Sequence, residues 1–283
     1  MIKGGVFMLM NGITVELESP LSSYEKRDDV IYPEVVHETY FSTTTGLDRG
    51  ANVILPPKYD TSKKYPVLYL LHGIFGDEYV HLRDNDRKLL ELLGNLTADG
   101  LCEEMIVVLP HMYATSDPNQ QPAFNAEAVK PYDNFINDLV TDLMPFIRSK
   151  YSVYTDREHQ AIAGFSMGGR ETLFIGFTRP DLFNYVGAIA PAPGATPAQD
   201  WAMTHPGQMQ ESEMTFAGKE YAAKLVMVCC GSNDGTVGQF PLGYHKILET
   251  NQVPHTWIEF PGAEHNATAI RPGLYNFLRA VFK

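Results

Sequence analysis

The stretch Ala161-Ile162-Ala163-Gly164-Phe165-Ser166-Met167-Gly168-Gly169 joins a short apolar run to a glycine-rich turn, which opens a helical pattern. A strand, a Gly-x-Ser-x-Gly turn and a helix in this order are typical of a nucleophile elbow, in which the serine occupies a strained turn. The three glycines let neighbouring chain segments approach closely. Such a turn exposes the Ser166 hydroxyl at a helix N-terminus, where backbone N–H groups favour developing negative charge. The alternative is a glycine-rich turn whose serine only caps the helix.

Continuous apolar runs on both sides of this stretch predict strands that are buried on both faces, over 67–71, 105–109, 161–163, 185–189, 225–228 and 256–260. Helical patterns alternate with them, over 86–96, 133–148, 167–177, 244–250 and 268–282. Three earlier segments mix apolar and polar residues and predict antiparallel strands at the outer edge of the sheet, over 13–17, 35–41 and 51–55. We therefore expect an α/β fold with a mostly parallel central sheet, antiparallel N-terminal edge strands and helices on both faces.

Two connections, 111–131 and 191–223, are longer than such a fold requires. Both hold too many apolar and aromatic residues for plain disorder. We expect them to be ordered walls over a site at the carboxyl ends of the strands, where open α/β sheets bind ligands. Since α/β units of roughly 250 residues often form around one sheet, we expect residues 1–283 to form a single domain.

The composition argues against several classes of protein. The 283 residues include 34 Asp and Glu against 22 Lys and Arg, which gives a formal net charge of −12. This balance argues against nucleic acids and anionic membranes as partners, and no apolar run approaches the roughly 18 residues of a spanning helix. The N-terminus has only a five-residue apolar stretch, too short for a signal-peptide core. The chain as given is therefore predicted to be cytoplasmic, or secreted if an export signal was trimmed, and its oligomeric state stays open.

The cysteines Cys102, Cys229 and Cys230 are too few for a disulfide framework, and the adjacent pair follows an apolar run. We expect buried structural thiols. Neither Cys-x-x-Cys nor His-Glu-x-x-His occurs in the sequence, so no metal site and no cofactor are expected.

A catalytic serine needs a base, because its hydroxyl is a poor nucleophile at neutral pH. In α/β-hydrolases the order along the chain is Ser, then Asp or Glu, then His. His265 follows the strand at 256–260 and precedes the last helix, so we expect it at the carboxyl edge of the sheet. Structural or solvent-exposed roles fit the other histidines after Ser166 better, namely His205, His245 and His255.

The base in turn needs an acid that fixes its tautomer. Asp234 lies in Gly231-Ser232-Asn233-Asp234-Gly235, directly after the predicted strand that precedes His265. It is the predicted acid, although Asn-Asp-Gly is also ordinary turn chemistry. Asp181 and Asp200 are weaker candidates.

An oxyanion hole needs two backbone donors. One is the Met167 N–H, which follows the serine, and the other is the Ile74 N–H in the loop after strand 67–71. Gly73 and Gly76 let this loop curl toward the site. His72, in the same loop, is expected to support it by hydrogen bonding.

At these residues the sequence resembles carbohydrate esterase family 1, the feruloyl and acetylxylan esterases of the esterase D-like α/β-hydrolases, and especially the feruloyl esterase domains of bacterial xylanases. The resemblance runs from about Tyr65 to the C-terminus, through the segments 70–74, 151–159, 161–169, 231–234 and 272–278. It implies an α/β-hydrolase fold and a triad of Ser166, Asp234 and His265. The chain departs from the family at Arg170, where a third glycine usually follows the elbow, and at Phe75-Gly76, where the family usually has Gly-Gly.

The resemblance implies a serine carboxylic-ester hydrolase that releases hydroxycinnamic acids such as ferulic acid from esterified plant cell-wall polysaccharide, for example arabinoxylan. The expected partner is a small-molecule or oligosaccharide ester. An aromatic slot for the acyl group is predicted from Phe75, Tyr113, Phe124 and Trp201, each of which equally suits simple loop packing. The alternatives are an acetylxylan esterase, a thioesterase like S-formylglutathione hydrolase and an inactive carbohydrate-binding relative.

Overall fold

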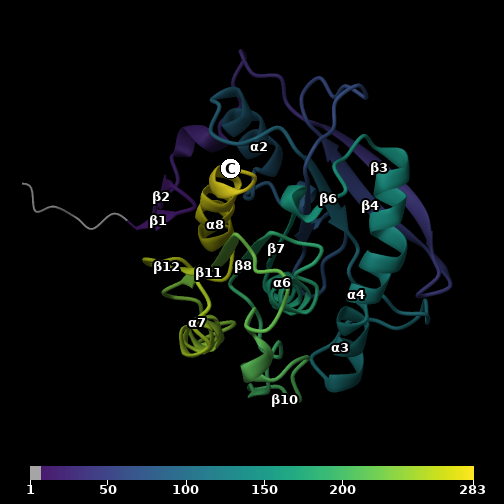
Figure 1. Ribbon diagram of the computed structural model, residues 1–283, viewed down its shortest axis with the longest axis vertical. Helices are drawn as coiled ribbons and strands as arrows, with labels where there is room; N and C mark the ends of the chain where they lie inside the picture. The colour runs from purple at the N-terminus through teal and green to yellow at the C-terminus, as the bar shows by residue number, and fades with distance from the viewer. Residues whose placement is uncertain (1–7) are drawn as a thin grey trace, which may run out of the picture.

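The computed structural model describes residues 8–283, and its centre is an eight-stranded sheet with the order β12-β11-β8-β7-β5-β6-β4-β3 (Figure 1). The strands are β3 (Glu34–Ser42), β4 (Leu47–Leu55), β5 (Val67–Leu71), β6 (Ile106–Pro110), β7 (Gln160–Phe165), β8 (Tyr185–Ile189), β11 (Leu225–Gly231) and β12 (Thr256–Phe260). Strand β4 pairs antiparallel with β3 and β6, and all other neighbours are parallel. The predicted mostly parallel sheet with an antiparallel N-terminal edge is confirmed.

Helices cover both faces of this sheet (Figure 1). On one face α2 (Leu89–Ala98) and α8 (Ala267–Ala280) pack into one apolar core. A second core on the other face takes side chains from α3 (Ala126–Asp133), α4 (Phe135–Asp138), α5 (Met144–Lys150), α6 (Met167–Thr178) and α7 (Phe240–Thr250). Strands β5 and β7 are buried at every residue, which explains their continuous apolar runs.

The predicted edge strand at 13–17 is wrong as a member of the main sheet. Only β2 (Ile13–Thr14) forms there, and it pairs with β1 (Leu9–Met10) in a separate ribbon. Asn11 and Gly12 both have positive φ, as a two-residue hairpin turn requires. The backbone of Glu16 then bonds twice to the side chain of Asn276 on α8, which holds this segment against the helix and not against the sheet.

The predicted helices differ from the observed ones at several boundaries: α7 begins at Phe240 and not at residue 244, and α8 ends at Ala280 and not at residue 282. Two further differences have a local cause. Helix α2 begins at Leu89 and not at residue 86, because Lys88 takes the left-handed φ of 52° and interrupts the helical pattern. The segment predicted as one helix over 133–148 continues to Lys150 and contains a π turn at Leu139–Leu143. Pro145 has no N–H for a normal α bond one turn back, which favours such a change of register.

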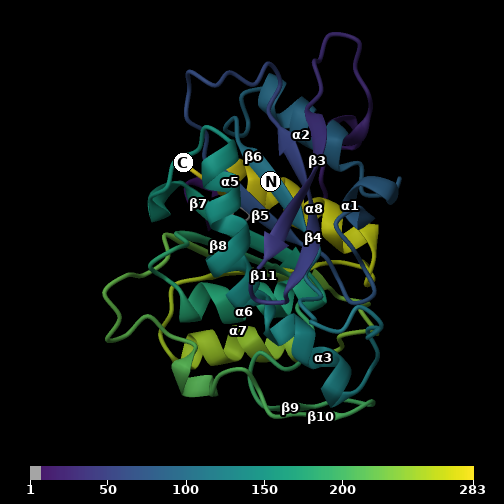
Figure 2. The ribbon, with the colours of Figure 1, turned by 90° about the vertical axis from the view of Figure 1, so that its right-hand side faces the viewer.

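Short elements complete the description: η1 (Leu21–Tyr24), α1 (Val80–Arg83), η3 (Arg157–His159) and η4 (Glu211–Glu213). The long connection after β8 forms a small antiparallel ribbon of β9 (Ala198–Gln199) and β10 (Thr204–His205). Both views place this ribbon at one end of the molecule, beside α3 (Figure 2). Within residues 8–283 no helix is long and apolar enough to cross a membrane.

The three cysteines are buried and unpaired. Cys229 and Cys230 lie in β11, and burial raises the pKa of the Cys230 thiol to about 12. The expectation of buried structural thiols is confirmed.

Candidate active site

Ser166 occupies the turn between β7 and α6 with φ 59° and ψ −118°, a backbone conformation that residues with side chains rarely adopt. Its N–H donates to Ile189 O at 3.0 Å, and its carbonyl accepts from Ala192 N at 3.0 Å. These bonds tie the turn to the end of β8 and to the connection that follows it. The strained serine is therefore held from two sides.

The glycines around Ser166 are needed for close packing. A Cβ on Gly168 would lie 2.5 Å from Leu71 O, and a Cβ on Gly164 would collide with the backbone of Gly168. Helix α6 thus begins directly against the end of β5, and a side chain at either position would push the turn away from the oxyanion loop.

Asp234 and His265 form a hydrogen bond of 2.7 Å between Oδ2 and Nδ1. An ionised carboxylate only accepts, so Nδ1 carries the proton and Nε2 keeps its lone pair. The other oxygen, Oδ1, accepts from the N–H groups of Thr236 at 3.0 Å and Val237 at 3.1 Å. One oxygen of Asp234 thus takes part in the turn, and the other contacts the imidazole of His265, where the predicted acid would stand.

The electrostatics of this pair favour an ionised Asp234. Burial raises the pKa of its carboxyl, but the hydrogen bond from His265, the electrostatic attraction of that side chain and two backbone amides outweigh this effect and hold the pKa below its ordinary value. The side chain is 1% exposed, so water does not compete for these bonds.

The loops that carry Asp234 and His265 are joined by their own backbones. Asn233 N donates to Ala263 O at 2.9 Å, and Gly262 N donates to Ser232 Oγ at 2.8 Å. A Cβ on Gly231 would overlap the Ala263 carbonyl, so glycine at the end of β11 permits this contact. The separation of the two side chains is therefore set by the contact between the loops.

The loop after β5 brings Gly73 and Ile74 beside the serine. A Cβ on Gly73 would lie 3.4 Å from the Ser166 Cβ, and Ile74 lines the same pocket as Ser166. Among residues 8–283, the N–H groups of Ile74 and Met167 have no hydrogen-bond acceptor. Both amides are thus free to bind an anionic oxygen.

His72 supports this loop through two hydrogen bonds, as expected. Its Nδ1 donates to Gly73 O at 2.7 Å, and its Nε2 accepts from Met112 N at 3.0 Å, which fixes one neutral tautomer. Burial lowers the pKa of His72 to about 3, despite the hydrogen bond to Gly73.

This shift predicts a pH-dependent contribution to stability. The unfolded chain binds a proton at His72 near the ordinary pKa of 6.5 and the folded chain only near 3, so stability is lost as the pH falls from 6.5 toward 3. We expect His72→Gln to reduce the slope of the unfolding free energy against pH by up to about 1.4 kcal/mol per pH unit in this window. Urea unfolding of both proteins between pH 4 and 7.5 measures the slopes, and parallel slopes would contradict this assignment.

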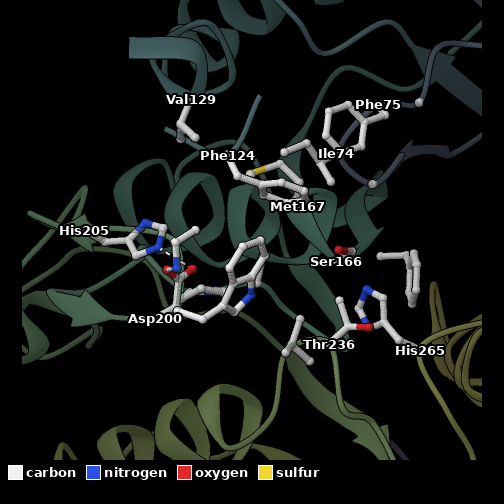
Figure 3. Close-up of a pocket in the computed structure, with 18 of the residues that line it drawn as sticks. Ile74, Phe75, Phe124, Val129, Ser166, Met167, Asp200, His205, Thr236 and His265 are labelled. Atoms are coloured by element: carbon white, nitrogen blue, oxygen red, sulfur yellow. Dashed lines mark hydrogen bonds and ion pairs between the residues drawn. The ribbon is translucent and has the colours of Figure 1, made fainter. Parts of the chain in front are cut away.

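Ser166 and His265 line one pocket with a volume of about 280 Å³, and Figure 3 shows both side chains at one side of it. The pocket walls come from the loop after β5, from the elbow and from both long connections. Asp234 lies behind His265 and outside the lining. The structure thus brings the five predicted residues Ser166, Asp234, His265, Ile74 and Met167 together at the carboxyl ends of the strands.

Three of the four predicted aromatic residues form a row at the mouth of the pocket. The ring centroids of Phe75 and Phe124 lie 5.1 Å apart, and those of Phe124 and Trp201 lie 5.3 Å apart. All three side chains are exposed, Trp201 by 78%. Large apolar groups left open beside a pocket are typical of binding surfaces. We call Phe75, Phe124 and Trp201 the aromatic rim.

Tyr113 does not belong to this rim. Its side chain is buried and packs edge-on against Tyr132, with ring centroids 5.0 Å apart, in the core under α3 and α4. Tyr113 follows the end of β6 by only three residues, so it stays close to the sheet. Phe124 lies further along the same connection and lines the pocket.

The pocket wall contains a second Asp–His pair, which the sequence does not predict. Asp200 Oδ2 bonds His205 Nε2 at 2.9 Å, and Asp200 Oδ1 accepts from Ala202 N and Met203 N. Both side chains line the pocket on the side away from His265 (Figure 3). The pair closes the β9–β10 turn that presents Trp201. Its only signal in the sequence is the spacing of Asp200 and His205 around a short turn.

Arg170, the residue after the last glycine of the elbow, links α6 to the pocket walls. Its buried guanidinium forms ion pairs with Asp133 at the end of α3 and with Glu171. Glu171 in turn accepts from Gln208 in the connection after β8, and burial raises the pKa of Glu171 to about 8. Both walls are therefore anchored to the helix that follows the serine.

Within residues 8–283, no group of three or more His, Cys, Asp or Glu side chains is arranged to hold a metal ion. The chemistry that this site offers is a hydroxyl on a strained turn, an imidazole oriented by a carboxylate and two free amides. This set suits attack on a carbonyl and stabilisation of the resulting oxyanion.

Comparisons with known proteins agree with this chemistry. A family model described as putative esterase matches residues 42–256. An endo-1,4-beta-xylanase/feruloyl esterase from Xylanibacter ruminicola is 32% identical over 231 residues, which cover 80% of this chain and 28% of that protein. The chain thus spans less than a third of the length of this relative.

Solved structures extend the comparison. A CE1 ferulic acid esterase from Anaeromyces mucronatus, in complex with ferulic acid, is 44% identical with a TM-score of 0.90, and the match covers 95% of this chain and 98% of that one. An S-formylglutathione hydrolase from Staphylococcus aureus is 17% identical with a TM-score of 0.67, over 89% of this chain and 100% of that one, and shows the fold alone. The fold is that of the α/β-hydrolases, as the sequence predicted.

Proposed function

The chain belongs to the esterase family and, within it, to carbohydrate esterase family 1, and from this premise we propose that it is a serine esterase releasing hydroxycinnamic acids such as ferulic acid from esterified sugars of plant cell walls. The observation that carries the proposal is the Asp234–His265 hydrogen bond beside Ser166, in a pocket whose mouth holds the aromatic rim. The Asp234–His265 pair and Ser166 supply the ester chemistry, and the aromatic rim supplies a surface for an aromatic acyl group.

In the proposed mechanism Ser166 Oγ attacks the ester carbonyl while His265 Nε2 takes its proton. Asp234 holds the imidazole in the tautomer that leaves Nε2 free and stabilises the imidazolium that forms. The carbonyl oxygen becomes an oxyanion and accepts hydrogen bonds from Ile74 N–H and Met167 N–H. His265 then protonates the leaving alcohol, and water repeats the sequence to release the acid.

The acyl preference rests on the aromatic rim. A ferulate ring can stack on Trp201 or Phe124, while the solved relative from Anaeromyces mucronatus holds ferulic acid itself. An acetyl group has no ring and offers no surface for such stacking. The rim therefore favours a hydroxycinnamate over acetate.

We expect the enzyme to hydrolyse methyl ferulate with a higher kcat/KM than acetylated xylan, and Trp201→Ala to raise KM for methyl ferulate roughly tenfold with little change for 4-nitrophenyl acetate. The reason is that only the ferulate ring reaches the rim. Steady-state kinetics on the three substrates measure both effects.

Phe41→Ala is the matched control, because Phe41 is an exposed aromatic residue on β3 that does not line the pocket. A wild-type preference for acetylated xylan or for S-formylglutathione would overturn the hydroxycinnamate assignment. An equal loss on methyl ferulate and 4-nitrophenyl acetate in Trp201→Ala would show that the rim acts on the fold and not on the acyl group.

A further inference from the structure

Arg87, just before α2, is a charged residue in the pocket wall that the proposed mechanism does not use. It is only 8% exposed, yet it lines the pocket together with Phe165, Ser166 and His265. Such burial is expensive for a guanidinium unless each of its donors has a partner.

Two of its three nitrogens have partners. Nε donates to Asp84 Oδ2 at 2.8 Å, and Nη1 donates to His81 Nδ1 at 2.9 Å. His81 Nε2 donates to Leu71 O at 3.3 Å, so Nδ1 is the acceptor of its tautomer. These contacts hold the guanidinium in one orientation.

The third nitrogen, Nη2, has no hydrogen-bond partner in residues 8–283. Unlike the nitrogens of a fully enclosed guanidinium, Nη2 keeps some accessible surface. Arg87 lines the active-site pocket and not the neighbouring depression formed by His81, Asp84 and Lys88. Nη2 is therefore the guanidinium nitrogen that is left to donate to a ligand in the active-site pocket.

The position of Arg87 indicates which part of an ester it meets. Its guanidinium lies 5.7 Å from the ring centroid of Phe165, and that ring lies 4.5 Å from the ring of His265. His265 must reach the leaving oxygen in order to protonate it, so the alcohol lies on the His265 side. Figure 3 places His265 at one side of the pocket and His205 with Asp200 at the other. Arg87 thus belongs to the alcohol side.

We propose that Arg87 binds a sugar hydroxyl oxygen in the alcohol part of the ester through Nη2, and that this contact makes the enzyme prefer feruloylated sugars to simple alkyl ferulates. The proposal rests on the proposed function and adds to it the group that recognises the sugar. A hydroxyl on a furanose ring supplies the acceptor that Nη2 lacks, and a methyl ester does not.

The test compares two esters that share the acyl group, feruloyl arabinose and methyl ferulate, on the full chain. We expect Arg87→Met to lower kcat/KM for feruloyl arabinose about tenfold to a hundredfold more than for methyl ferulate, the range of one hydrogen bond to a charged group. Arg83→Met is the matched control, since Arg83 is an exposed arginine on α1 that pairs with Asp77, and the ratio of the two kcat/KM values should stay at its wild-type value.

A second measurement needs no substitution and is unaffected by any loss of folding in Arg87→Met. Wild-type enzyme should turn over tetrahydrofurfuryl ferulate, which keeps a five-membered ring without hydroxyls, with a kcat/KM close to that for methyl ferulate. A kcat/KM for tetrahydrofurfuryl ferulate close to that for feruloyl arabinose would overturn the role of Arg87 and leave the esterase function standing. An equal loss of kcat/KM on feruloyl arabinose and methyl ferulate in Arg87→Met would do the same. Absence of wild-type activity on every feruloyl ester would instead overturn the proposed function itself.

Discussion

Ser166→Ala is expected to lower kcat for methyl ferulate about 10⁶-fold, because the hydroxyl oxygen forms the bond to the acyl group in the proposed mechanism. Hydrolysis at roughly 10³ over the uncatalysed rate should remain, since the Ile74 and Met167 amides still bind the oxyanion. The alanine keeps the backbone of the elbow and removes one buried oxygen, so the fold should persist. Stopped assays with sensitive detection of ferulate, together with thermal unfolding, measure both effects.

The control for Ser166→Ala is Ser149→Ala, which removes an exposed hydroxyl on α5 that donates to Phe146 O. Its kcat should equal that of the wild type. Turnover by Ser166→Ala within a hundredfold of wild type would mean that another group attacks the ester, and the mechanism would be wrong.

Asp234→Asn is expected to lower kcat about 10⁴-fold with the fold intact. An asparagine presents either an N–H₂ group or a weaker oxygen to His265 Nδ1, so the imidazole no longer keeps its proton on Nδ1. Nε2 then becomes a donor and does not accept the proton of Ser166. Steady-state kinetics on methyl ferulate give the size of the loss.

The second Asp–His pair of the pocket supplies the matched control. Asp200→Asn weakens the Asp200–His205 bond and the turn that carries Trp201, so we expect a higher KM and a kcat within about tenfold of wild type. If kcat fell further in Asp200→Asn than in Asp234→Asn, the catalytic acid would be Asp200 and not Asp234.

The sequence predicts those parts of the structure that depend on local signals and on chain order. The elbow is visible in nine consecutive residues, because its glycines are required by contacts within the turn and with β5. Asp234 and His265 lie 31 residues apart, yet the position of each after a strand predicts that they meet, and the structure joins them by a hydrogen bond. Parallel strands bring such loops to one edge of the sheet, whatever the intervening sequence.

The parts that the sequence did not predict depend on tertiary contacts. Tyr113 and Phe124 are aromatic residues of the same connection, but one is buried against Tyr132 and the other stands at the pocket mouth, and composition does not distinguish them. Arg87 looks like a surface arginine at the start of an amphipathic helix. Its burial becomes visible only when the pocket wall formed with Phe165 is known.

The central claim, that Ser166 is the nucleophile activated by His265 and Asp234, is tested most directly by labelling with a fluorophosphonate followed by mass spectrometry of the digested protein. We predict one adduct, on the peptide that contains Ser166, with slower formation in the presence of methyl ferulate and much slower formation in Asp234→Asn. An adduct on another residue, or an unlabelled Ser166 in protein that hydrolyses methyl ferulate, would contradict it.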